Sequence, residues 1–135
     1  MPAASGWGVT LLCVIALTAG CTSVAGDPSL AGSAAQDFHA ALASGKPDAA
    51  CELLAPGTLT GLEESSGTSC RKALADEGLP DAVAVTTTDV YGTNARVVLK
   101  GDTVFLARFG SQWKVTAAGC TPRPGLPYDC AVKGP

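Results

Sequence analysis

The pattern of the sequence changes at Pro80, and this change constrains the fold more than any other feature. Between residues 33 and 78, apolar residues recur at helical spacing, and the segments end at Gly or Pro. After Pro80, runs rich in Val, Thr, Phe and Trp are separated by short Gly-containing segments that are typical of β-hairpins. The pattern therefore predicts an α+β protein in which three short N-terminal helices pack on a four-stranded antiparallel meander. The predicted strands are residues 82–91, 95–100, 103–109 and 112–118.

Capping residues predict where the helices begin and end. Ser, Thr and Pro are favoured at helix starts, and Gly is favoured just past the last turn. Residues 58–64 are expected to add one or two helical turns between the second and third helices. The predicted helices run from Ser33 to Gly45, from Pro47 to the break at Pro56-Gly57, and from Thr68 or Ser69 to Gly78.

The hairpin turns decide which strand residues share a face of the sheet. If Gly101-Asp102 and Gly110-Ser111 are both two-residue turns, directly opposed residues share a face, and a slip of one residue would invert the faces. The face expected beneath the helices holds Ala95, Val97, Leu99, Val104, Leu106, Trp113, Val115 and Ala117, with Arg108 as its one charged member.

Arg108 and Trp113 are opposite each other in this register and form the candidate ligand-binding position. An Arg on a Trp face gains a cation–π interaction of about 0.5–2 kcal/mol. An unpaired cation on a buried face is costly. Arg108 is therefore expected either to pair with a helix acid such as Asp37 or Glu52, or to open into a mouth that accepts an anionic or aromatic group.

The N-terminal residues predict export. Residues 9–19 (VTLLCVIALTA) are an uncharged apolar run that is too short to cross a bilayer but suits the core of a signal peptide.

Residues 17–21 (LTAGC) resemble the lipobox of bacterial lipoproteins, in which the cysteine becomes the acylated N-terminus. This predicts a lipoprotein signal peptide (1–20), a lipidated tether (21–32) and a folded domain (33–135). The acyl chains on Cys21, palmitate among them, would anchor the domain in the cell membrane, on its extracytoplasmic face. The alternatives are an ordinary secretory signal cleaved nearby, or a buried helix.

The cysteines agree with export. With Cys13 lost in the signal peptide and Cys21 used for lipid, an even number remains, which in an exported chain indicates disulfides. Short loops cost less entropy to close, so local pairing is expected among the three possible connectivities. No paired C-x₂-C spacing indicates a zinc site, and no metal or other cofactor is expected. The predicted disulfides are Cys51–Cys70 and Cys120–Cys130.

Helices followed by a strand containing residues 112–115 (QWKV) resemble the NTF2-like (cystatin-like, cone-shaped) superfamily. Residues 49–54 (AACELL) with Cys70, then Gly119-Cys120 and residues 128–130 (YDC), are similar to small envelope lipoproteins of high-GC Gram-positive bacteria, which are mostly uncharacterised. The resemblance covers residues 33–135 and implies a curved sheet with the helices on its concave face. Because the superfamily includes both enzymes and binding domains, it assigns no activity.

The net charge argues against nucleic acid as a partner. The net charge of −3 is too small and of the wrong sign for a nucleic-acid binder. Residues 21–81 hold nine acids and three bases, whereas residues 82–135 hold three acids and six bases. This division suits either an acidic helical layer packed on a basic sheet or two solvated faces of opposite sign.

No residue pattern indicates catalysis. The single histidine, His39, is expected to be half-exposed on the first helix and not to act as a base. Asp89 is expected to form an exposed ion pair with Arg96 across two strands. The predicted function is non-catalytic: a binding or accessory domain for a membrane or wall partner or a small ligand. The alternative is a small hydrolase or isomerase with a cone pocket. A polar dyad in a deep cavity would favour the enzyme, and an exposed Phe105–Phe109 patch would favour the interaction module.

Overall fold

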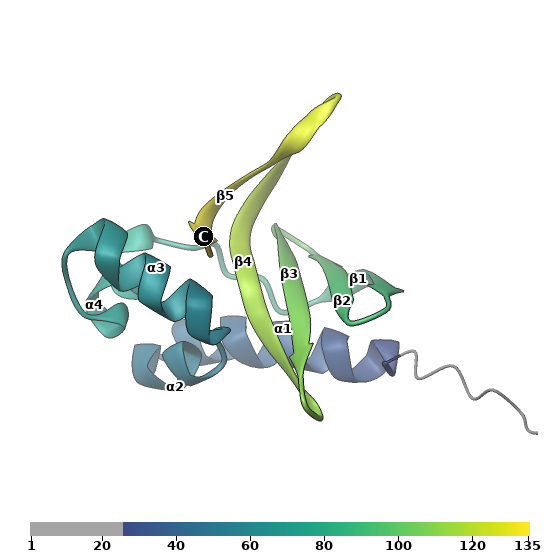
Figure 1. Cartoon of the computed structure of the whole chain (residues 1–135), viewed down its shortest axis with the longest axis horizontal. Helices are drawn as coiled ribbons and strands as arrows, with labels where there is room; N and C mark the ends of the chain where they lie inside the picture. The colour runs from purple at the N-terminus through teal and green to yellow at the C-terminus, as the bar shows by residue number, and fades with distance from the viewer. Residues whose placement is uncertain (1–25) are drawn as a thin grey trace, which may run out of the picture.

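The computed structural model describes residues 26–135, and the predictions for the signal peptide, Cys21 and most of the tether lie outside these residues. The described chain is an α+β fold with four helices followed by a five-stranded antiparallel sheet in the order β1-β2-β3-β4-β5 (Figure 1). The elements are α1 (Pro28–Ala43), α2 (Pro47–Glu52), α3 (Pro56–Ser66), α4 (Cys70–Glu77), β1 (Val85–Tyr91), β2 (Asn94–Leu99), β3 (Asp102–Phe109), β4 (Gln112–Arg123) and β5 (Leu126–Lys133).

The prediction of three helices was wrong because a proline was treated as a break. Pro56 occupies the first position of α3, an eleven-residue helix. Proline is harmless there, because the first helical N–H groups have no acceptor within the helix. α1 and α2 also begin at a proline.

The first helix begins six residues earlier than predicted. Asp27, and not Ser33, is the N-cap of α1, and its side chain accepts a hydrogen bond from the Ser29 backbone N–H at 2.8 Å. An Asp-Pro pair supplies both the cap and a favourable first residue. The folded part of the chain therefore extends into the predicted tether.

The prediction of four strands was also wrong, because the C-terminal segment pairs with β4 as a fifth strand. Four prolines after residue 121 argued against a strand there. However, β5 is the last strand of the sheet, and an edge strand tolerates prolines because half of its N–H groups need no partner. The first strand begins at Val85 and not at residue 82.

The predicted register is correct at the β3–β4 turn and wrong elsewhere. Arg108 is opposite Trp113 and Leu106 is opposite Val115, as predicted. A two-residue turn at Gly101-Asp102 would place Leu99 opposite Val104, but Leu99 is opposite Asp102. The pairing of β2 with β3 is therefore displaced by two residues, and the same residues still share a face. A β-bulge beside Leu106 displaces the rest of β4, so that Ala118, and not Ala117, is buried.

The core lies between α1 and the sheet. α1 contacts β1, β2, β3 and β4, while α3 packs on β4 and β5. Figure 1 shows α2, α3 and α4 grouped on one side of the sheet and the β4–β5 hairpin extending away from the helices. The largest fully buried side chains are Phe38, His39, Leu74, Val97, Val104, Leu106, Val115 and Val132.

The link between α2 and α3 covers the part of β4 that β5 does not reach. The Ala55 N–H donates to the Val115 carbonyl at 2.8 Å, and the Val115 N–H donates to the Leu53 carbonyl at 2.8 Å. These bonds form a short parallel bridge between Leu54 and Val115. The first half of β4 is therefore not an open sheet edge.

Candidate functional site

Arg108 and Trp113 lie together where the sheet ends at the β3–β4 turn. They occupy facing positions on β3 and β4, and the Arg108 guanidinium carbon lies 6.0 Å from the centroid of the Trp113 ring. Trp113 is 6% exposed, and Arg108 is half-buried. The cation–π contact expected from the register is therefore present, at the outer limit of its usual range. Ligand binding at this pair stays a prediction.

Gly26, in the segment just before α1, covers the Arg108–Trp113 pair. A Cβ atom built at Gly26 would overlap Trp113 Cζ2 and would lie 3.0 Å from Arg108 Cδ. Only a glycine allows the backbone to approach the ring so closely. The segment just before α1 is therefore part of the site, and a ligand that reached the Trp113 ring from this side would have to displace Gly26. No sequence signal distinguished Gly26 from the other glycines.

An open hollow lies on the other side of Trp113. It is lined by α1, the end of α2 and the β3–β4 turn, including Leu30, Asp37, Leu53, Gln112 and Lys114. The Lys114 ammonium donates to the Glu52 carbonyl at 2.7 Å, which ties β4 to the end of α2. The hollow is wide and exposed, so it does not enclose a small molecule as a typical ligand pocket does.

His39 and Asp102 form a buried polar pair that no sequence pattern indicates. His39 was expected to be half-exposed and is 1% exposed. Its Nε2 lies 2.8 Å from Asp102 Oδ2. A carboxylate oxygen only accepts, so Nε2 carries the proton and donates it. Asp102 was assigned to a turn but is the first residue of β3.

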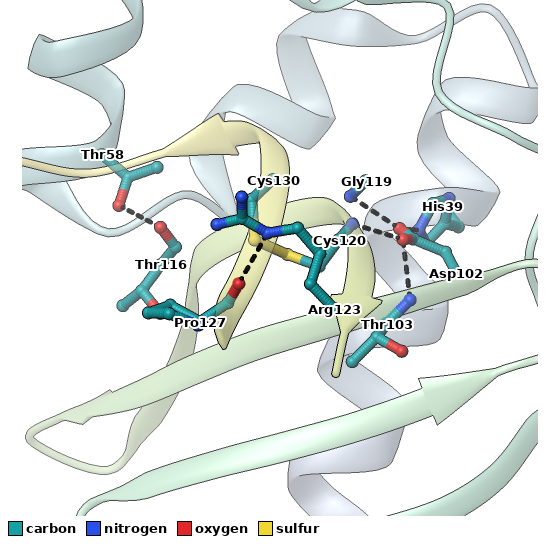
Figure 2. Close-up of a disulfide and its surroundings, with 10 residues drawn as sticks. All are labelled: His39, Thr58, Asp102, Thr103, Thr116, Gly119, Cys120, Arg123, Pro127 and Cys130. Carbon is teal, nitrogen blue, oxygen red and sulfur yellow. Dashed lines mark hydrogen bonds and ion pairs between the residues drawn. A yellow bond between two sulfur atoms is a disulfide. The ribbon is translucent and has the colours of Figure 1, made fainter. Parts of the chain in front are cut away.

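Asp102 also accepts three backbone hydrogen bonds, as Figure 2 shows. Oδ1 accepts from the Thr103 N–H at 2.7 Å and from the Cys120 N–H at 2.9 Å, and Oδ2 accepts from the Gly119 N–H at 2.9 Å. With His39, each oxygen therefore has two donors. Gly119 has a φ of 64° and a Cβ there would lie 2.6 Å from Leu79 Cδ2, so the bend of β4 requires glycine.

This arrangement makes the His39–Asp102 pair structural. The carboxylate joins α1, the start of β3 and the bend of β4 at one buried point. Its four donors already use the acceptor capacity of both oxygens, and the two side chains are 1% and 2% exposed. A catalytic acid or base has to reach a substrate proton, and neither side chain is accessible to one.

The expected ion pair between Asp89 and Arg96 is present, but both side chains are half-buried and not exposed. The two residues face each other on β1 and β2, and Arg96 donates to Asp89 Oδ2 at 2.6 Å and 3.1 Å. Arg96 also donates to the Tyr128 hydroxyl at 3.4 Å, and the Tyr128 ring meets Phe105 edge-on. The hydrogen bonds to Asp89 and then Tyr128 hold the pKa of Arg96 above its ordinary value. Phe105 is therefore half-buried, and only Phe109 of the expected aromatic patch is exposed.

Both predicted disulfides are confirmed. Cys51–Cys70 joins α2 to the start of α4, and Cys120–Cys130 joins β4 to β5 next to the Asp102 cluster (Figure 2). The local pairing follows the lower entropy of closing short loops. In residues 26–135, no group of three or more His, Cys, Asp or Glu side chains is placed to hold a metal ion. Over the same residues, no helix is both long and apolar enough to span a bilayer.

Comparison with known proteins gives no relative. No protein-family model, curated protein or solved structure matches the chain.

Proposed function

We propose that this protein is a lipid-anchored extracytoplasmic domain whose role is to bind a membrane or wall partner or a small ligand, without catalysis. The observation that carries the proposal is the cysteine pairing. The four cysteines in the described residues form two disulfides, which suits an oxidising compartment. Of the cysteines after the proposed cleavage site, this leaves Cys21, at the end of the lipobox-like residues 17–21, for the acyl chains.

The burial of His39 and Asp102 and the open hollow beside Trp113 favour a binding role over an acid–base enzyme. His39 and Asp102 are sealed inside the fold and are fully used in holding its elements together. The hollow beside Trp113 is open to solvent, whereas the cavities of acid–base enzymes exclude water. Exposed apolar side chains such as Phe109 suit contact with a partner.

The anchor is tested by metabolic labelling with a fatty-acid probe in a bacterial host, followed by detergent partition. The wild-type chain should incorporate the probe and enter the detergent phase, and Cys21→Ala should lose both properties. Cys13→Ala is the matched control, because this cysteine lies in the same N-terminal region but is removed with the signal peptide. Labelling that persists in Cys21→Ala, or that is lost in Cys13→Ala alone, would contradict the proposal.

A further inference from the structure

We propose that the domain has a fixed orientation on the bilayer, with one end of the sheet resting on the lipid surface. This end, called here the Trp113 end, comprises the first turn of α1, the β1–β2 turn and the β3–β4 turn around Trp113. The inference rests on the proposed acylation of Cys21 and adds to it an interaction surface. The partner is the outer surface of the leaflet that holds the acyl chains.

The three parts of the Trp113 end are held together by direct contacts. The Arg108 N–H donates to the Thr93 carbonyl at 2.8 Å, which places the β1–β2 turn next to the end of β3. Gly26 lies against the Trp113 ring, and Leu30 lines the same hollow as Ser111 in the β3–β4 turn. The start of the described chain is therefore fixed at this end of the sheet.

The length of the chain before Gly26 limits the distance to the membrane. Cys21 and Gly26 are five residues apart, and a fully extended chain of that length spans at most about 18 Å. β4 bends at Gly119, and Figure 1 shows the β4–β5 turn at the opposite end of β4 from the β3–β4 turn. Because Gly26 is packed at the Trp113 end, the anchor holds this end close to the bilayer and leaves the β4–β5 turn far from it.

The exposed side chains suit this orientation. Residues 26–135 have five large hydrophobic residues that are strongly exposed, and three of them are at the Trp113 end: Leu30 at 55%, Tyr91 at 64% and Phe109 at 46%. Two of the three are aromatic, and tyrosine in particular is favoured at a membrane–water interface. The turn residues 92–93 and 110–111 carry no charge, so the approach of these two turns to the interface does not require a charged group to lose its hydration. Asp27, at the start of α1, is exposed and has to stay hydrated.

The opposite end of the sheet differs in charge. The β2–β3 turn contains the exposed Lys100, and the β4–β5 turn is preceded by the exposed Arg123. Leu126, which is 60% exposed, lies opposite Arg123 at the far end of β4. Leu126 is therefore an exposed apolar residue that the proposed orientation keeps away from lipid, and it provides a matched control for Phe109.

The test measures the quenching of a single tryptophan by brominated lipid. Phe109→Trp and Leu126→Trp are made separately in a Trp113→Phe background, and the acylated proteins are reconstituted into phosphatidylglycerol–phosphatidylcholine vesicles with and without bromine on the acyl chains. Bromine quenches only a ring that is close to it. The tryptophan at position 109 should lose most of its emission, and the one at position 126 should be unaffected. If the Trp113→Phe background does not fold, the two variants are compared with Trp113 retained as a constant contribution.

The outcomes separate the orientation from the anchor. Equal quenching at both positions, stronger quenching at position 126, or none at position 109 would overturn the orientation while vesicle flotation still shows anchoring. Loss of flotation in the wild-type chain would instead overturn the anchor, and the orientation with it. An insertion of about ten Gly and Ser residues after Cys21 should reduce the difference between the two positions, since a longer flexible tether no longer holds one end near the bilayer.

Discussion

The replacement Asp102→Asn gives the sharpest test of the buried polar cluster. Each carboxylate oxygen of Asp102 accepts two hydrogen bonds, from His39 and Gly119 at Oδ2 and from Thr103 and Cys120 at Oδ1. Asparagine replaces one of these oxygens with an amide NH₂ group, which donates and does not accept. In either orientation of the amide, two buried N–H donors lose their acceptor.

The expected cost follows from the number of lost acceptors. A buried donor left without its partner costs about 1–3 kcal/mol, and more where the acceptor was charged, so Asp102→Asn should lower the free energy of unfolding by about 3–5 kcal/mol. A domain of this size has a total stability of about 5–15 kcal/mol, so the loss is a large part of it. Asp129→Asn is the matched control, because Asp129 is an exposed carboxylate on β5, and its replacement should change the stability by less than about 0.5 kcal/mol.

The measurement is a urea titration of the disulfide-intact domain, followed by the emission of Trp113, which is the only tryptophan after residue 21. A fall in the midpoint with an unchanged slope reports a loss of stability. His39→Gln, alone and together with Asp102→Asn, completes a double-mutant cycle that should show a coupling of about 1 kcal/mol or more. If the midpoints of Asp102→Asn and Asp129→Asn agree, the cluster does not stabilise the fold and the reasoning fails.

Two further predictions concern the start of the described chain. Gly26→Val should displace this segment from Trp113 and move the tryptophan emission towards longer wavelength. Gly61→Ala is the control, because its added Cβ would lie 3.6 Å from the nearest neighbouring atom, and it should leave the emission unchanged. Equal spectra of the two variants would show that Gly26 does not cover the ring. The hydrogen bonds from Ser29 lower the pKa of Asp27 below its ordinary 3.8, so Asp27 contributes stability that is fully present above this value and is lost as the pH falls through the folded-state pKa. Asp27→Asn should keep the helix cap but remove this part of the acid dependence in pH-resolved thermal unfolding, and an unchanged acid limb would contradict the assignment.

The local parts of the fold could be predicted because their causes lie close together in the sequence. Apolar spacing and turn residues identified the α+β class and four of the strands, and the entropy of short loops selected the pairing of Cys51 with Cys70 and of Cys120 with Cys130. The opposition of Arg108 and Trp113 followed from a two-residue turn. The errors were local as well: Pro56 opens a helix, and an edge strand accommodates the C-terminal prolines.

The sites that hold the molecule together were decided only by the tertiary structure. His39 and Asp102 are 63 residues apart, and no residue near either of them in the sequence indicates that it is buried. Burial of these polar groups requires hydrogen-bond partners, and those partners belong to other elements of the fold. The bulge beside Leu106, which exchanges Ala117 for Ala118 in the core, likewise depends on how β4 bends across β3. The sequence by itself determines which segments favour helix or strand and which cysteines close short loops. Contacts such as that of Gly26 with Trp113 form only when segments that are distant in the sequence pack together.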